Sequence, residues 1–154
     1  MYQFKKYIVC TALVILGAMI CGTINGQNLK RNRWENRVLL IQASDISSEK
    51  FQDQLSEFND SQEGLEERKL LVYQIVGDKY RIYNSPKKKS DEGWKGVEGR
   101  SFSSLDKGEI FKVTLIGLDG GIKLERTTIL KKIALFRIID SMPMRISEMR
   151  NNKN

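Results

Sequence analysis

Val38-Leu39-Leu40-Ile41 and Leu70-Leu71-Val72-Tyr73-Gln74-Ile75-Val76 are two largely apolar runs with polar flanks. Such runs are typical of central strands that are covered on both faces of a sheet. Between them, Phe51, Leu55 and Phe58 recur at spacings of four and three, which indicates one apolar helical stripe. A strand, a helix and a second strand within so short a span predict a parallel, right-handed βαβ unit.

A second sheet-forming region follows further along the chain. Phe111–Ile116 predicts a strand, and Leu118-Asp119-Gly120-Gly121 predicts a tight turn, because Asp-Gly and Gly-Gly supply the positive φ that hairpins need. Ile122–Glu125 is then the returning strand. Between the two regions, residues 84–104 hold Pro86 and three glycines without an apolar period. That composition predicts a long surface loop.

The sequence closes with a predicted helix. It is expected to end near Ser141, with Ile129, Ile133 and Phe136 on its main apolar stripe. Because proline cannot continue a helix, Pro143 is expected to end or kink it, and the polar residues that follow are expected to fray.

Length and composition bound the class of protein. The chain has 154 residues, of which 29% are charged and 40% hydrophobic, as in one globular domain. Its formal charge is +7, and Lys5 and Lys6 contribute two of those charges, which leaves +5 for the remainder. This moderate excess favours acidic surfaces or polymers, and it is too small for a dedicated nucleic-acid arm. Nucleic acid is therefore not an expected partner.

Residues 1–26 follow the three-part plan of a secretory signal peptide. Met1–Lys6 is basic, Tyr7–Ile20 is largely apolar, and the residues after it are small and polar. Cleavage near Gly26 leaves Gln27–Asn154 as a single mature domain. We therefore expect an exported protein, periplasmic or secreted.

Two alternatives to cleavage at this position remain. An uncleaved segment would act as a membrane anchor, although its apolar run is shorter than a typical span. A lipoprotein would use Cys21, but Ile20 stands where a lipobox normally has a small residue. Both cysteines, Cys10 and Cys21, lie in this segment, and the chain has no histidine. The mature domain therefore cannot form a disulfide or run thiol, histidine or thiolate–zinc chemistry, and no cofactor is expected.

Three motifs resemble one particular domain. They are Trp34-Glu35-Asn36-Arg37, Leu115-Ile116-Gly117-Leu118-Asp119-Gly120-Gly121-Ile122-Lys123-Leu124 and Ile139-Asp140-Ser141-Met142-Pro143-Met144-Arg145. Together they resemble the domain of unknown function found in secreted bacterial proteins and in animal extracellular-matrix proteins such as equarin and the sushi-repeat-containing proteins. The resemblance covers roughly Leu29 to Arg150.

The element order and the resemblance lead to one expected fold. The order βαβ, long loop, ββα is the plan of a thioredoxin-like α/β fold, with helices packed on a mixed four-stranded sheet. The resemblance implies a thioredoxin-like group without the redox motif. In agreement, Ala43–Ser48 lacks Cys-x-x-Cys and Asp106–Ile110 lacks the proline that precedes the third strand of redox thioredoxins.

Candidate site residues come from the motifs and from the basic clusters. Trp34 and Arg37 have two possible interpretations. In the first, they are an aromatic residue and a cation that face a ligand. In the second, which we favour, Trp34 forms a lid on the core and Arg37 pairs with a carboxylate such as Asp140. Asp119, with Asp45 and Asp78, follows or lies near a strand end, but no spacing among them demands a metal site.

The Asp119-Gly120-Gly121-Ile122-Lys123 segment joins two strands and lacks P-loop spacing, so hairpin chemistry explains it. Met142 and Met144 are expected to pack under the sheet edge, while Arg145 could have a functional role. The residues carried by the motifs are Trp34, Arg37, Asp119, Gly120, Gly121, Lys123, Asp140, Pro143, Met144 and Arg145. Lys87, Lys88 and Lys89 are candidates for contact with a polyanion.

The expected function is binding. A thioredoxin-like plan without its redox residues, together with a basic surface, suggests a binding or adhesion module for an anionic envelope or matrix polymer or for another exported protein. Contact with a membrane is expected only if residues 1–26 stay attached. The alternative is a non-thiol enzyme, a hydrolase or transferase that uses a carboxylate, a lysine or a serine.

Overall fold

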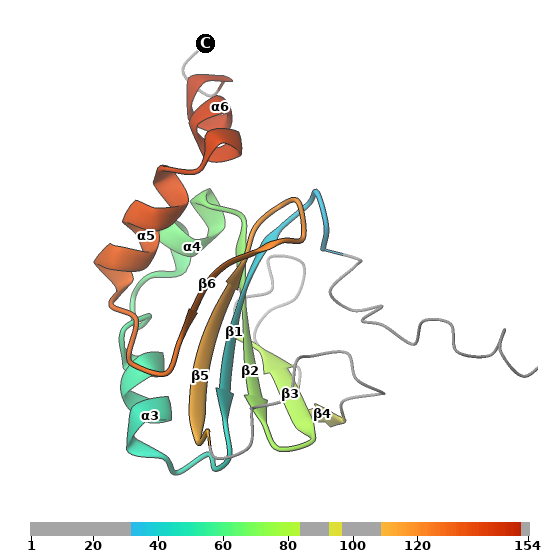
Figure 1. The fold of residues 1–154 in the computed structure, drawn as a ribbon, viewed down its shortest axis with the longest axis vertical. Coiled ribbons are helices and arrows are strands. Elements are labelled where there is room, and N and C mark those ends of the chain that lie inside the picture. The colour runs from blue at the N-terminus through green and yellow to red at the C-terminus, as the bar shows by residue number, and fades with distance from the viewer. Residues whose placement is uncertain (1–31, 84–92, 97–108, 152–154) are drawn as a thin grey trace, which may run out of the picture.

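A computed structural model describes residues 32–83, 93–96 and 109–151 of the chain, and within them it shows an α/β fold (Figure 1). The strands are β1 (Arg37–Ala43), β2 (Leu70–Val76), β3 (Lys79–Ile82), β4 (Lys95–Gly96), β5 (Phe111–Ile116) and β6 (Ile122–Arg126). The helices are α3 (Glu49–Ser56), α4 (Gln62–Glu67), α5 (Lys132–Asp140) and α6 (Pro143–Asn151).

The strands form one mixed sheet in the order β4-β3-β2-β1-β5-β6. β1 and β2 run parallel from Arg37 opposite Leu70 to Ala43 opposite Val76, as the two apolar runs predicted. Every other pair that the described residues form is antiparallel. The expected count of four strands is wrong, because the chain turns at Gly77 to form β3 beside β2, and β4 pairs with the outer edge of β3.

Both faces of the central strands are buried. All seven residues of β1 are buried, because the strand lies between β2 and β5 and packs on two sides. The first core lies under the helices, which Figure 1 shows on one side of the sheet. Its largest buried members are Leu39, Ile41, Phe51, Phe58, Leu65, Leu70, Phe111, Leu115, Leu130, Leu135 and Ile139. The second core lies on the opposite face and is formed by Val38, Leu40, Leu71, Tyr73 and Ile75.

The predicted main stripe of the last long helix is wrong at Ile133 but right at Phe136, which packs against the first core. α5 begins at Lys132, three residues later than Ile129. Leu135 and Ile139 are the residues it buries, whereas Ile133 is 70% exposed. The N-terminus of α5 is capped from another element, since the Lys132 N–H donates to the Glu57 carboxylate at 3.1 Å.

The C-terminal residues also depart from expectation. The expectation of fraying is wrong for residues 144–151, because they belong to α6, while residues 152–154 lie outside the described part of the chain. Pro143 is the first residue of α6, where a missing N–H costs nothing. In Figure 1, α6 lies beyond the end of the sheet at which β1 begins. None of the helices described is long and apolar enough to cross a bilayer.

The long predicted loop is only partly covered by the described residues. Residues 84–92 and 97–104 fall outside them, as do residues 1–31 with the predicted signal segment. Residues 93–96 are described, and they contain the short strand β4. Trp94 packs against the first core and lies under the guanidinium of Arg81, 4.9 Å from the ring centre to Cζ.

Candidate functional site

Three segments that are distant in the sequence meet at the end of the sheet where β1 begins. The backbone N–H of Trp34 donates to the carbonyl of Leu118 at 2.8 Å, which joins the segment before β1 to the β5–β6 turn. A β-carbon on Gly120 would lie 3.5 Å from Cδ of Arg33. The guanidinium of Arg37 reaches Glu148 of α6 at 3.2 Å, and Nη1 of Arg145 in the third motif lies 3.7 Å from the same carboxylate. The three motifs of the sequence thus occupy neighbouring positions in space.

Trp34 does not form a lid on the core, and the expectation that it would is wrong. Its side chain is 60% exposed, and its backbone φ is 69°. A bulky residue with positive φ is a backbone outlier that costs about 1–3 kcal/mol unless its surroundings hold it there. The hydrogen bond to Leu118 holds it, and the guanidinium of Arg33 lies 5.3 Å from the ring centroid.

A hollow of about 390 Å³ is lined in part by Arg33, whose guanidinium lies over the Trp34 ring, although Trp34 itself is not one of the lining residues. Its walls come from the segment before β1, from the first residues of β1 and from the β5–β6 turn. The lining residues are Asn32, Arg33, Asn36, Val38, Ile116, Gly117, Asp119, Gly120 and Gly121. Two amides, one guanidinium and one carboxylate therefore line the hollow together with the apolar side chains of Val38 and Ile116, which suits a ligand that has both polar groups and apolar surface.

The β5–β6 turn holds the carboxylate of this hollow in a fixed position. Asp119 Oδ1 accepts the N–H of Gly121 at 3.0 Å, and Oδ2 accepts from Nζ of Lys123 at 2.6 Å. The Lys123 ammonium and then the Gly121 N–H lower the pKa of Asp119. Gly120 adopts φ 80°, a conformation that glycine reaches without strain. Asp119 is therefore an ionised acceptor at neutral pH.

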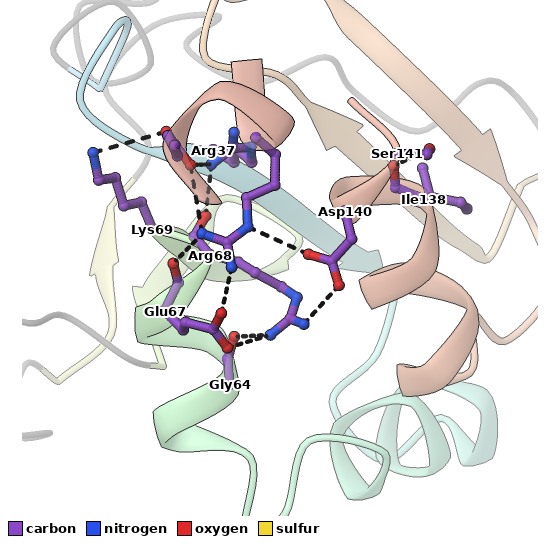
Figure 2. Close-up of polar contacts among 10 residues, drawn as sticks. Arg37, Gly64, Glu67, Arg68, Lys69, Ile138, Asp140 and Ser141 are labelled. Atoms are coloured by element: carbon purple, nitrogen blue, oxygen red, sulfur yellow. Dashed lines mark hydrogen bonds and ion pairs between the residues drawn. The ribbon is translucent and has the colours of Figure 1, made fainter. Parts of the chain in front are cut away.

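A second polar group lies on the helix side of the same end of the sheet, and we call it the arginine cluster (Figure 2). It consists of Arg37, Arg68 and Arg145 with the carboxylates Glu67, Asp140 and Glu148. Arg37 is 1% exposed and Arg145 is 2% exposed, so two guanidinium groups are taken out of water. Such burial requires paired carboxylates and hydrogen bonds.

The partners within the arginine cluster differ from the expected pairing of Arg37 with Asp140. Arg37 Nη1 donates to the Arg68 carbonyl at 2.9 Å and to Glu148 at 3.2 Å. Asp140 instead accepts from Arg68 Nη2 at 2.7 Å and from Arg145 Nε at 3.3 Å. The expectation failed because Glu148 lies in a helix that the polar C-terminal sequence did not reveal.

The methionines flanking Pro143 are placed differently from each other. Met142 packs against the first core, as expected, whereas Met144 is 41% exposed. Arg145, read from the sequence as a functional candidate, is instead buried. It donates to the Glu67 carbonyl at 2.9 Å and to the Glu67 carboxylate. The buried cation therefore fastens the start of α6 to the end of α4.

The remaining candidates do not join these groups. Lys87, Lys88 and Lys89 lie outside the described residues. The pKa of Asp45 is lowered by the backbone and hydroxyl of Ser47, which makes it a local turn carboxylate. In the part of the chain that the structure describes, no three carboxylates lie close enough to hold a metal ion.

Gln54 is one of several buried polar residues that sequence reasoning did not mark. Its side chain is fully buried, and its amide accepts from the Leu130 N–H at 2.7 Å and donates to the Leu130 carbonyl at 2.9 Å. Nothing in the sequence marks this bridge, because Gln54 and Leu130 are 76 residues apart.

Comparison with known families gives one finding. The sequence model of the family described as Domain of unknown function (DUF4174) matches residues 28–148. No curated protein and no solved structure matches the chain significantly.

Proposed function

The chain belongs to the DUF4174 family, and from that premise we propose that it is an exported, non-redox binding module that holds a saccharide of an envelope or matrix polymer. The proposed binding site combines the hollow lined by Arg33 and Asp119 with the exposed ring of Trp34, over which the Arg33 guanidinium lies. Export is supported by the signal-like pattern of residues 1–26, and the absence of cysteine and histidine from residue 27 onward removes thiol and histidine chemistry.

The arrangement of the inner strands supports a thioredoxin-like fold. Within the sheet they are ordered β2-β1-β5-β6, with β2 parallel and β5 antiparallel to β1. A βαβ unit followed by a hairpin and a helix on one face is the thioredoxin-like plan. β3 and β4 extend this sheet beyond β2, where the plan has no strand.

The observation that carries the proposal is the exposed Trp34 in a left-handed backbone conformation. Proteins retain such an outlier where the surroundings enforce it, and outliers cluster at binding sites. An exposed indole offers a flat apolar surface with one polar N–H. A sugar ring has an apolar C–H face and a hydroxyl rim, so the ring can stack on Trp34 while its hydroxyls reach Asn36 and Asp119 in the hollow.

The electrostatics of the hollow favour binding over acid–base catalysis. Asp119 is fixed by Lys123 and by the Gly121 N–H, and its pKa is lowered. A general acid or base works best with a pKa near the working pH. A carboxylate held in the ionised state accepts hydrogen bonds from hydroxyl groups but is a weak proton donor or base at neutral pH.

The test is direct titration of the purified chain with a panel of neutral and anionic oligosaccharides by calorimetry. The matched variants are Asn36→Ala, which removes an amide from the hollow, and Gln62→Ala, which removes an exposed amide from α4. We expect Asn36→Ala to weaken binding about tenfold, or ~1.4 kcal/mol, and Gln62→Ala to leave it unchanged.

Charge neutralisation at Lys87–Lys89 separates a general polyanion contact from this site. A general contact weakens steeply with salt and is lost in that variant. Absence of binding to every saccharide, or equal affinity in Asn36→Ala and the parent chain, would sink the proposal.

A further inference from the structure

The carboxylate of Glu148 lies among three cations at the arginine cluster. Oε2 is 3.2 Å from Arg37 Nη1 and 3.7 Å from Arg145 Nη1, and Oε1 is 3.8 Å from Lys69 Nζ. Its side chain is 18% exposed. Three cations around one carboxylate form an anion site, and the occupant comes from the protein's own last helix.

The site has donor capacity that Glu148 does not use. Arg37 Nε and Nη2 are buried, and within the described residues neither has a hydrogen-bond partner. A planar guanidinium can bind a carboxylate through two parallel N–H groups, which is its strongest arrangement. Glu148 engages only Nη1 of Arg37. Glu148 therefore binds the Arg37 guanidinium in a geometry weaker than the two-bond arrangement.

The helix that carries Glu148 is weakly anchored by apolar contacts. Arg145 is the one buried residue of α6, and Met144 is 41% exposed. Segments with few buried apolar contacts open locally at a lower free energy than the whole fold. Arg145 stays in place when the later turns of α6 open, because Glu67 and Asp140 hold it independently of Glu148.

We propose that Arg37, Arg145 and Lys69 form a carboxylate-binding site that Glu148 fills in cis, and that an acidic side chain of a partner peptide replaces Glu148 when residues 146–151 open. Opening leaves Arg37, Arg68, Lys69 and Arg145 facing Glu67 and Asp140, which is a surplus of two positive charges. An acidic peptide fits this site because its present occupant is itself a glutamate on a peptide backbone.

This site is separate from the proposed saccharide site. Arg37 and Val38 are consecutive in β1, so their side chains point to opposite faces of the sheet. Val38 lines the hollow, whereas Arg37 lies on the helix side with the first core residue Leu39. The two sites can therefore be tested independently of each other.

The experiment uses the full chain and two probes, a blocked five-residue alanine peptide with one central glutamate and the same peptide with glutamine. Removing the Glu148 carboxylate raises the fraction of molecules in which the site is free to bind, and therefore raises the apparent affinity for the glutamate peptide. We expect Glu148→Ala and Glu148→Gln to bind the glutamate peptide at least tenfold more tightly than the parent chain does. The glutamine peptide should bind to neither. In the double variant Arg37→Met with Glu148→Gln, the tighter binding of the glutamate peptide should be lost.

A second arm needs no variant. In the parent chain, millimolar glutamate peptide should speed amide hydrogen exchange in residues 147–151, while exchange in β1 stays unchanged. Two results would overturn the proposal: equal binding of the glutamate and glutamine peptides by both Glu148 variants, or exchange in α6 that the glutamate peptide leaves unaltered.

Discussion

Nη1 of Arg37, at the start of β1, lies 3.2 Å from the carboxylate of Glu148 in α6, although 111 residues separate the two in the sequence. The arginine is 1% exposed and the glutamate 18%. This contact joins the first strand to the last helix, and the two partners have very different access to water.

The difference in exposure predicts an asymmetry between two substitutions. Glu148→Gln removes the negative charge that balances the buried guanidinium of Arg37, and it should lower the free energy of unfolding by about 2–3 kcal/mol. Arg37→Met removes the buried charge itself and leaves Glu148 partly hydrated. It should therefore lower the free energy of unfolding by less than Glu148→Gln does. Urea unfolding of both variants measures this, with Glu63→Gln on the exposed face of α4 as the control. A larger cost for Arg37→Met would contradict the account.

Gly64 in α4 should not tolerate alanine, although alanine is normally the better helix former. A β-carbon there would lie 2.8 Å from Cε2 of Phe136, whose ring stacks under the Arg68 guanidinium at 4.2 Å. Overpacking should make Gly64→Ala less stable by about 1–3 kcal/mol. Thermal unfolding measures the loss, and Phe136→Leu in the same chain should recover part of it. Stabilisation by Gly64→Ala alone would show that the ring can move aside.

Gln54 should matter far more than an exposed glutamine. Gln54→Met keeps the side-chain length but leaves the buried N–H and carbonyl of Leu130 without their partner, at a cost of about 2 kcal/mol. Gln52→Met on the exposed face of the same helix should stay within ~0.5 kcal/mol of the parent. Chemical denaturation compares the two. Equal stabilities would mean that Leu130 finds other partners in the folded protein.

Glu57 predicts how stability falls in acid. The Lys131 ammonium and then the Lys132 N–H lower its pKa below the ordinary value of about 4.5, and Glu57 in turn raises the pKa of Lys131. Because the folded pKa is depressed, the contribution is fully present above pH 4.5 and is lost as the pH falls through the folded pKa. The stability difference between the parent chain and Glu57→Gln should therefore be constant from pH 7 to 5 and shrink below 4.5. A difference that does not change between pH 7 and 3 would show that the carboxylate is not held by these donors.

The sequence was informative where one stretch decides its own structure. The runs at 38–41 and 70–76 predicted buried parallel strands, because continuous apolar residues can be buried only between two packed layers. The Asp119–Gly121 turn was also predictable, since its geometry depends on a local side-chain bond and on glycine at positive φ.

The sequence did not predict those features whose structure depends on residues far away in the chain. α6 has a polar sequence, and its place depends on contacts between Arg145 and Glu67, which are 78 residues apart. α5 starts where the Glu57 carboxylate, 75 residues away in the sequence, accepts the Lys132 N–H, and no local pattern marks that start. Trp34 was expected to form a lid on the core, and no local pattern predicts its exposure, its positive φ or its backbone bond to Leu118.

Trp34→Gly tests the central claim most directly when stability and saccharide affinity are measured on the same sample. Glycine adopts φ 69° without strain and keeps the N–H that donates to Leu118, so the fold should be as stable as the parent or more stable by up to ~1 kcal/mol. Binding of the saccharide found by calorimetry should fall at least tenfold, because the stacking surface is gone. A marked loss of stability, or unchanged affinity in a stable variant, would contradict the assignment of Trp34 to a binding site.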